Sequence, residues 1–178
     1  MDIYYSSVGR NSLLLLNCAP DKRGLIPEQD IRNVKKIKEI IDGTFKTNLP
    51  ASAKIKTQYS TSMLFNLLVE DNKTCCIPVK DVTSATIKFD FGSEETFDVL
   101  MLKENFRNGQ RVEDFVLDAF ISGEWHERVK GTTIGYKRLL RFNPVNSRKV
   151  RLRILSSRDC TGIYSFGLYK SPAILNDK

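Results

Sequence analysis

The chain has 178 residues, of which 41% are hydrophobic and 28% are charged, and this composition excludes an intrinsically disordered protein. Its net charge of +7 would help an encounter with anionic surfaces, but charge alone specifies neither a partner nor a fold. No apolar run approaches the roughly 18 residues of a membrane-spanning helix, so we expect no membrane partner. The opening residues MDIYY do not resemble a signal peptide. The chain is therefore expected either to be cytoplasmic or to begin inside a longer protein.

The four cysteines do not predict a metal site. Cys75 and Cys76 are neighbours and lie too close for an unstrained disulfide. Cys18 and Cys160 are far apart in the sequence, which does not say whether they pair. Because no CxxC spacing is present, we expect no zinc site, and no cofactor is predicted.

Residues 1–43 are predicted to form one strand, one loop and one helix. The run Leu13–Leu16 is typical of a strand buried on both faces, as in parallel sheets. A loop follows, with turns at Pro20 and Gly24. The helix is expected to begin at Pro27 and to end at a Gly43 C-cap. A single βα unit lacks neighbours for its strand, so this pattern predicts the remnant of a larger parallel system.

After Gly43 the hydrophobic pattern changes from helical to alternating. One expected strand contains Ile87 and Phe89, and another contains Phe115 and Leu117. Further alternating runs lie at residues 125–129, 150–154 and 166–168. Several short alternating strands separated by turns are typical of an antiparallel β-sandwich. We therefore predict a mainly β protein, with a sandwich domain over residues 44–178.

Two stretches carry a family resemblance. The first is YYSSVGRNSLLLLNCAPDKRGLIPE, from Tyr4 to Glu28. The second is GTTIGYKRLLRF, from Gly131 to Phe142, followed by RKVRLRI at 148–154. Glu104-Asn105 and the run GQRV at 109–112 match as well. Together they resemble the last βα unit of the (β/α)8 barrel and the C-terminal sandwich of family 29 glycoside hydrolases, the α-L-fucosidases.

The resemblance implies a retaining enzyme that removes terminal α-L-fucose from glycans with two carboxylates of its barrel. It also implies a galactose-binding or discoidin-like jelly roll, and a parent protein that is periplasmic, secreted or lysosomal. No position in this chain corresponds to the nucleophile, and no motif places the acid/base. We therefore expect no catalytic residue here and no activity from the chain alone. The predicted role is an accessory region of a fucosidase, and the alternative is a free-standing carbohydrate-binding module.

Candidate site residues are few. Asn17 follows the predicted barrel strand, where it would line the barrel rim or merely end the strand with a backbone hydrogen bond. Discoidin-like lectins that bind fucose use a His and two basic residues, and the spacing of His126, Arg151 and Arg158 is similar to theirs. Their motif has an acidic residue where this chain has Arg153, so coincidence is the alternative.

Other partners follow from the same patterns. Clustered basic residues between 137 and 158 invite a nucleic-acid interpretation, but no aromatic pattern accompanies them and we expect no nucleic acid partner. Trp125 could stack on a sugar or pack in the core. The expected partners are a fucosylated glycan through the parent enzyme, the missing barrel, and a second copy of the chain through the unpaired strand.

Overall fold

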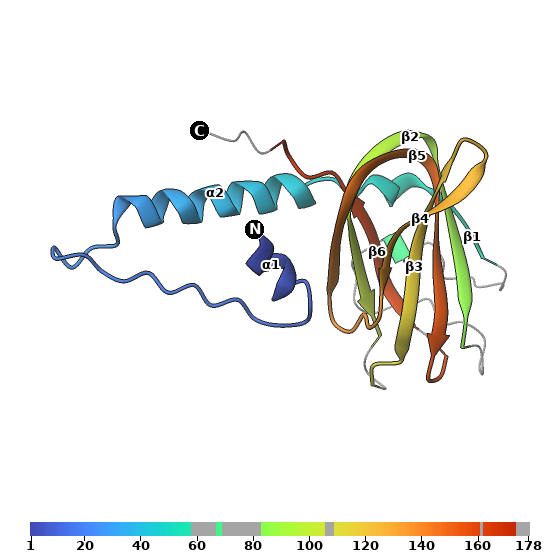
Figure 1. Ribbon diagram of the computed structural model, residues 1–178, viewed down its shortest axis with the longest axis horizontal. Helices are drawn as coiled ribbons and strands as arrows, with labels where there is room; N and C mark the ends of the chain where they lie inside the picture. The colour runs from blue at the N-terminus through green and yellow to red at the C-terminus, as the bar shows by residue number, and fades with distance from the viewer. Residues whose placement is uncertain (58–66, 69–82, 106–108, 161, 174–178) are drawn as a thin grey trace.

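The computed structural model describes residues 1–57, 67–68, 83–105, 109–160 and 162–173, which form a β-sandwich and a projecting arm (Figure 1). The arm consists of α1 (Asp2–Ser6), an extended segment, and α2 (Glu28–Phe45). The sandwich begins with η1 (Leu49–Ser52) and β1 (Lys54–Thr57). Its remaining strands are β2 (Ala85–Glu104), β3 (Val112–Ile121), β4 (Glu124–Gly131), β5 (Arg138–Ser157) and β6 (Ile163–Tyr169).

Two long strands, β2 and β5, run through both layers of the sandwich. The N-terminal half of β2 pairs with the C-terminal half of β5, for example at Lys88 and Arg151. These halves belong to a layer with the order β1-β2-β5-β3-β4. Their other halves form the second layer, in which β6 pairs with β2. Register shifts in β2 between Asp90 and Glu95 interrupt the ladder where the strand bends, as bulges do. Figure 1 shows both strands arching over one end of the sandwich. The predicted antiparallel sandwich is confirmed.

The core lies between the layers and follows the predicted alternation. Phe89 of the first layer stacks on Phe166 of β6, with ring centroids 4.0 Å apart. Phe115 and Leu117 are fully buried on the same side. Successive side chains of a strand point to opposite faces, so the residues between these face outward.

A second apolar cluster ties the arm to the sandwich. Tyr5 of α1 is buried with Val99, Met101 and Leu139 on the outer face of the second layer. The ring of Phe45 at the end of α2 contacts Tyr169 edge to face, with centroids 5.0 Å apart. The two ends of the arm are therefore anchored, while its middle projects away from the sandwich (Figure 1).

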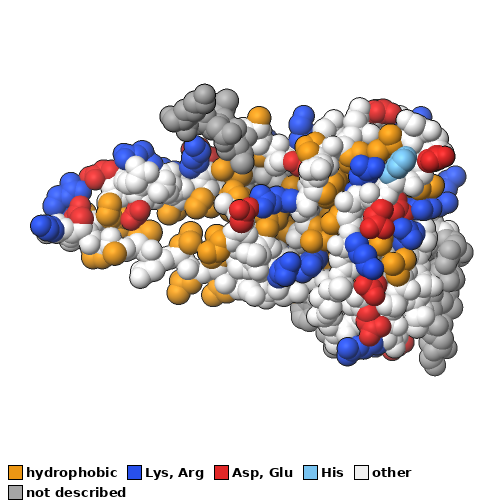
Figure 2. Space-filling view, in the orientation of Figure 1, with side chains coloured by type: hydrophobic (Ala, Val, Ile, Leu, Met, Phe, Trp, Pro, Cys, Tyr) orange, Lys and Arg blue, Asp and Glu red, His pale blue; other side chains and the backbone are white. Residues whose placement is uncertain are grey.

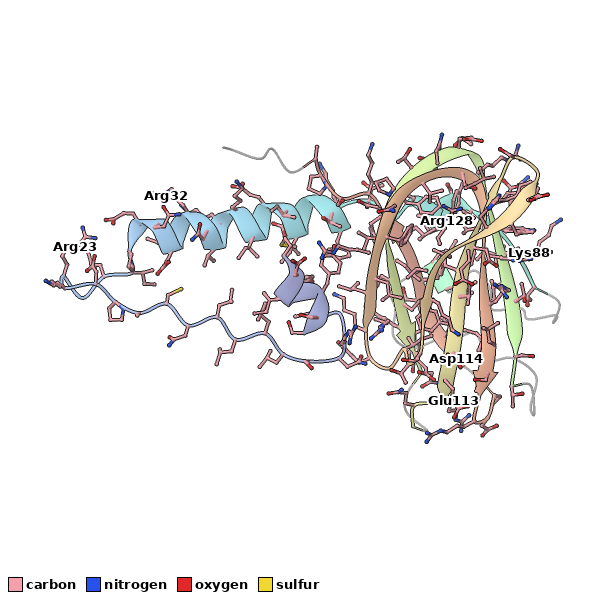
Figure 3. The ribbon with its side chains drawn as sticks, viewed as in Figure 1. Arg23, Arg32, Lys88, Glu113, Asp114 and Arg128 are labelled. Atoms are coloured by element: carbon pink, nitrogen blue, oxygen red, sulfur yellow. The ribbon has the colours of Figure 1, made fainter. Side chains whose placement is uncertain are left out.

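The tip of the arm is closed by an ion-pair turn. Arg23 bonds Asp21 at 2.6 Å and Glu28, the first residue of α2, at 2.8 Å. Gly24 has a φ of +74°, as expected for a turn glycine. Figure 3 shows Arg23 at this tip.

Three sequence predictions for the arm are wrong. Leu13–Leu16 form no strand, and the side chains of Leu13 and Leu15 are 89% and 86% exposed. The described chain offers this run no neighbouring strands, so its backbone has no ladder to join. The helix also continues past Gly43, because Phe45 gains its contact with Tyr169. Pro27 is the N-cap, so the helix begins at Glu28, one residue after the predicted start.

The described residues contain no helix that is both long enough and apolar enough to cross a membrane. Cys18 and Cys160 are both free thiols, whereas Cys75 and Cys76 lie outside the described residues.

Candidate functional site

The outer face of the first layer carries a dense set of charged side chains. Its strand registers align one residue per strand into a row, because paired residues of adjacent strands face the same side. That row is Lys56, Lys88, Arg151, Asp118 and Glu127, from β1 to β4. We call it the charged row.

Asp118 is the centre of the charged row. Its side chain is 2% exposed and accepts hydrogen bonds from Arg151 Nε at 2.5 Å and Arg153 Nε at 2.6 Å. Burial by itself would raise the pKa of Asp118, but the hydrogen bonds from the two guanidinium groups outweigh it and lower the pKa below 3.8. The same contact raises the pKa of Arg153. Asp118 and Arg153 are therefore held charged.

Aromatic rings flank the charged row. The guanidinium of Arg151 lies over Trp125, 4.6 Å from the ring centroid, in a cation–π contact. Trp125 also packs against Phe120 of β3 at 5.1 Å, and Lys149 Nζ lies 5.7 Å from the Phe120 centroid. Trp125 therefore lies on the outer face and takes no part in the core between the layers.

The structure brings together only part of the predicted lectin-like set. Arg151 and Arg153 share Asp118, but His126 pairs with Ala119, whose side chain lies in the core, so His126 faces the opposite side of the sheet. Arg158 follows the end of β5 and pairs with Glu113 at 3.1 Å. Sugar binding by these residues stays a prediction, but they do not converge as one site.

The acidic group that the lectin motif would place at position 153 has a spatial substitute here. Asp118 comes from the neighbouring strand and orders both arginines. Sequence spacing did not single out Asp118, because only the register between β3 and β5 places it opposite Arg151.

Asn17 is exposed in the extended segment of the arm, and its place at a barrel rim stays a prediction. Over the described ranges, no group of three His, Cys, Asp or Glu side chains could hold a metal ion.

The sequence stretches that carry the family resemblance meet at one junction, which we define by Asn11, Glu104 and Gly135. The buried carboxylate of Glu104 accepts backbone hydrogen bonds from Arg111 at 2.8 Å, Val112 at 2.9 Å and Gly135 at 3.1 Å. The Asn11 side-chain amide donates to the Ile134 carbonyl at 3.1 Å and accepts from the Lys137 amide at 2.6 Å. The junction therefore joins the arm to two loops of the sandwich.

No family model matches the chain. It is 38% identical to α-L-fucosidase 1 of Arabidopsis thaliana over 95% of its length, and this match covers 35% of that protein. A family 29 fucosidase of Ruminococcus gnavus, solved in complex with fucose, superposes with a TM-score of 0.85 at 30% identity. That match covers 97% of this chain and 36% of the other. The chain thus spans about a third of the length of the relatives it matches.

A chitosan-binding module of a Paenibacillus chitosanase/glucanase shares the fold alone. It superposes with a TM-score of 0.60 at 14% identity, over 68% of this chain and 97% of the module.

Proposed function

Because the chain belongs to the family 29 α-L-fucosidases, as a C-terminal part of these longer proteins, we propose that it is an accessory region that braces the catalytic barrel and supplies no catalytic carboxylate. In this proposal the rest of the parent protein removes terminal α-L-fucose from glycans. The arm holds the barrel, and the sandwich anchors the arm.

The exposed apolar surface of the arm is the observation that carries this proposal. Leu13, Leu15, Ile31 and Val34 are among its large hydrophobic residues that face solvent. Figure 2 shows hydrophobic side chains along both α2 and the extended segment. Apolar surface gathered on one projecting element favours a covering partner. The two thirds of the fucosidase relatives that this chain does not match would supply one.

The junction gives the arm a rigid base. Asn11 and the Gly9 carbonyl, which accepts from the Leu139 amide at 3.0 Å, fix the start of the extended segment to the sandwich. Phe45 fixes the end of α2. Two anchored ends limit how the middle can move, which suits a bracing role.

Activity measurements test the absence of catalytic groups. We expect the chain alone to release no nitrophenol from an aryl α-L-fucoside. Measurable release that disappears when one of its own carboxylates is replaced would refute the proposal.

A chimera tests the bracing role. This chain would replace the matching region of the Arabidopsis α-L-fucosidase 1, and the temperature at which fucosidase activity is lost would be measured. Ile31→Ser with Val34→Ser removes apolar contacts that we assign to the barrel, so inactivation should occur several degrees lower, following a loss of about 2 kcal/mol.

The control for the chimera lies on the same helix. Asn33→Ser with Lys35→Ser changes two exposed polar positions of α2 and should leave the inactivation temperature within about one degree. Equal losses from both pairs would mean that the apolar side of α2 contacts nothing in the enzyme.

The alternative is a free-standing carbohydrate-binding module. Trp125 and the two arginines on the outer face favour it, since aromatic and basic side chains suit sugar contacts. A glycan array with the purified chain separates the two functions. Saturable binding to fucosylated glycans supports the module, and its absence supports the brace.

A further inference from the structure

The outer face of the first layer is hollowed next to the charged row. One hollow of about 430 Å³ is lined by residues that include Lys54, Lys56, Lys88, Lys149 and Trp125. A second, of about 410 Å³, shares Lys56 and Lys88 and reaches Arg151. We call the two together the basic groove. Figure 3 places Lys88 on the side of the sandwich away from the arm, so the groove is separate from the surface assigned to the barrel.

Only part of the positive charge in the basic groove is balanced by acidic side chains of the described residues. Asp90 is engaged by Arg148 at 2.8 Å, with Lys149 at 3.9 Å. Asp118 is shared by Arg151 and Arg153. Within the part of the chain that the structure describes, Lys54, Lys56 and Lys88 form no ion pair. No described acidic side chain therefore competes with a ligand for these three ammonium groups.

The like charges of the basic groove destabilise the sandwich when no ligand is bound. Lys56 pairs directly with Lys88, and Lys88 pairs directly with Arg151. Like charges opposite each other on adjacent strands are destabilising. Lysines on β1 can be explained as protection of an edge strand, but Lys88 lies on β2, between two strands, where that explanation fails. An anion in the groove would offset the repulsion.

From this geometry we propose that the basic groove binds an acidic polysaccharide through carboxylate or sulfate groups on its sugars. The two adjoining hollows suit a linear chain. Lysine ammonium groups neutralise its charges, and Trp125 with Phe120 provides an apolar wall at one end for a sugar ring.

The groove fits a nucleic acid less well. Binding to single strands relies on successive aromatic rings that stack on the bases. Here Trp125 and Phe120 lie together at one end, Phe89 is buried against Phe166, and Arg151 covers one side of Trp125. The cations in the middle are lysines, and Arg151, the arginine of the described lining, already donates to Asp118, so it is not free to act as the bidentate clamp typical of phosphate recognition.

The protein carries its own reporter of this site. Trp125 is the single tryptophan of the chain and lines the groove. The full chain would be titrated with polygalacturonate, with dextran sulfate and with neutral dextran while Trp125 fluorescence is followed. We expect a saturable change with at least one acidic polymer and none with the neutral one, and the two acidic polymers distinguish carboxylate from sulfate recognition.

Charge-matched variants test the location. Lys56→Gln with Lys88→Gln should weaken binding at least about tenfold, because two charge-assisted contacts are lost. Lys35→Gln with Lys46→Gln removes the same charge from exposed positions on and after α2, and should weaken binding less than about twofold. Without ligand the groove variant should also melt higher than the parent chain, since it relieves repulsion.

Three results would overturn the proposal. One is the absence of any change in Trp125 fluorescence with both acidic polymers. Another is equal weakening by the two variant pairs, which would mean attraction to net charge. The third is equally tight binding of single-stranded oligodeoxythymidine with the same sensitivity to the groove variant, which would assign the groove to nucleic acids.

Discussion

Two glycines of the sequence stretches that carry the family resemblance are required by backbone geometry and close packing. A Cβ placed on Gly131 would lie 2.4 Å from the Cζ atom of Phe115, which is fully buried. Gly135 has a φ of +66°, and its Cβ would lie 2.6 Å from the side-chain nitrogen of Asn11. Both positions therefore require glycine, and the motif GTTIGYKRLLRF needs no catalytic explanation.

Gly131→Ala should destabilise the protein by about 1–3 kcal/mol, because the new methyl group displaces the Phe115 ring in a packed core. Gly43→Ala is the matched control. It lies inside α2, its Cβ would meet only Pro172 at 3.6 Å, and it should stabilise by about 0.5–1 kcal/mol. Urea unfolding of the two variants checks this pair, and similar losses from both would contradict it.

The contribution of Asp118 to the free energy of unfolding is expected to depend on pH. Its lowered pKa means that its contribution is fully present above pH 3.8 and is lost as the pH falls through the folded value. Asp118→Asn should cost about 2 kcal/mol at neutral pH, since two arginines lose a charged acceptor. The cost should shrink below about pH 4 as the parent chain protonates.

Asp90 offers a comparison for the acid prediction. Its carboxylate pairs with Arg148 at an exposed position, so Asp90→Asn should cost less than about 1 kcal/mol. Urea midpoints from pH 2.5 to 7 measure both variants. A cost for Asp118→Asn that does not change with pH would show that packing, not charge, is lost.

At the scale of elements, the boundary predicted at residue 44 can be tested by truncation. Deleting Met1–Gly43 removes Tyr5 and exposes Val99, Met101 and Leu139, but leaves the core between the layers intact. We expect a cooperative thermal transition at a lower temperature. An unfolded product by circular dichroism would place the arm inside the folding unit.

The strands could be predicted from the sequence because alternation is a local signal. Val150, Leu152 and Ile154 face the core, and the arginines between them face out, as the pattern requires. The strand predicted at Leu13–Leu16 was wrong because a strand also needs neighbouring strands, which are not a local signal. The described chain supplies none for this run.

The site was harder to predict than the fold. The clamp of Asp118 and the basic groove depend on which residues of β1, β2, β3 and β5 lie opposite each other. Register of that kind is set by bulges and turns across distant parts of the chain, which spacing within one segment does not contain.

For the whole molecule, the exposed arm predicts self-association of the isolated chain. The leucine run and the apolar side of α2 expose Leu13, Leu15, Ile31 and Val34, and a second copy could cover them in a closed dimer. Sedimentation at increasing concentration should show a species larger than a monomer. Leu13→Lys with Leu15→Lys should shift it toward the monomer, whereas a monomer at every concentration would contradict the prediction.

The path of β2 and β5 through both layers has a consequence for biosynthesis. β5 ends at Ser157, so neither layer can close until nearly all of the chain has left the ribosome, although the hairpin of β3 and β4 can form earlier. Pairing between such distant segments folds slowly, in milliseconds to seconds. Nascent chains stalled after Gly131 should therefore expose β2 to proteases, and those stalled long enough to release Tyr169 should resist them.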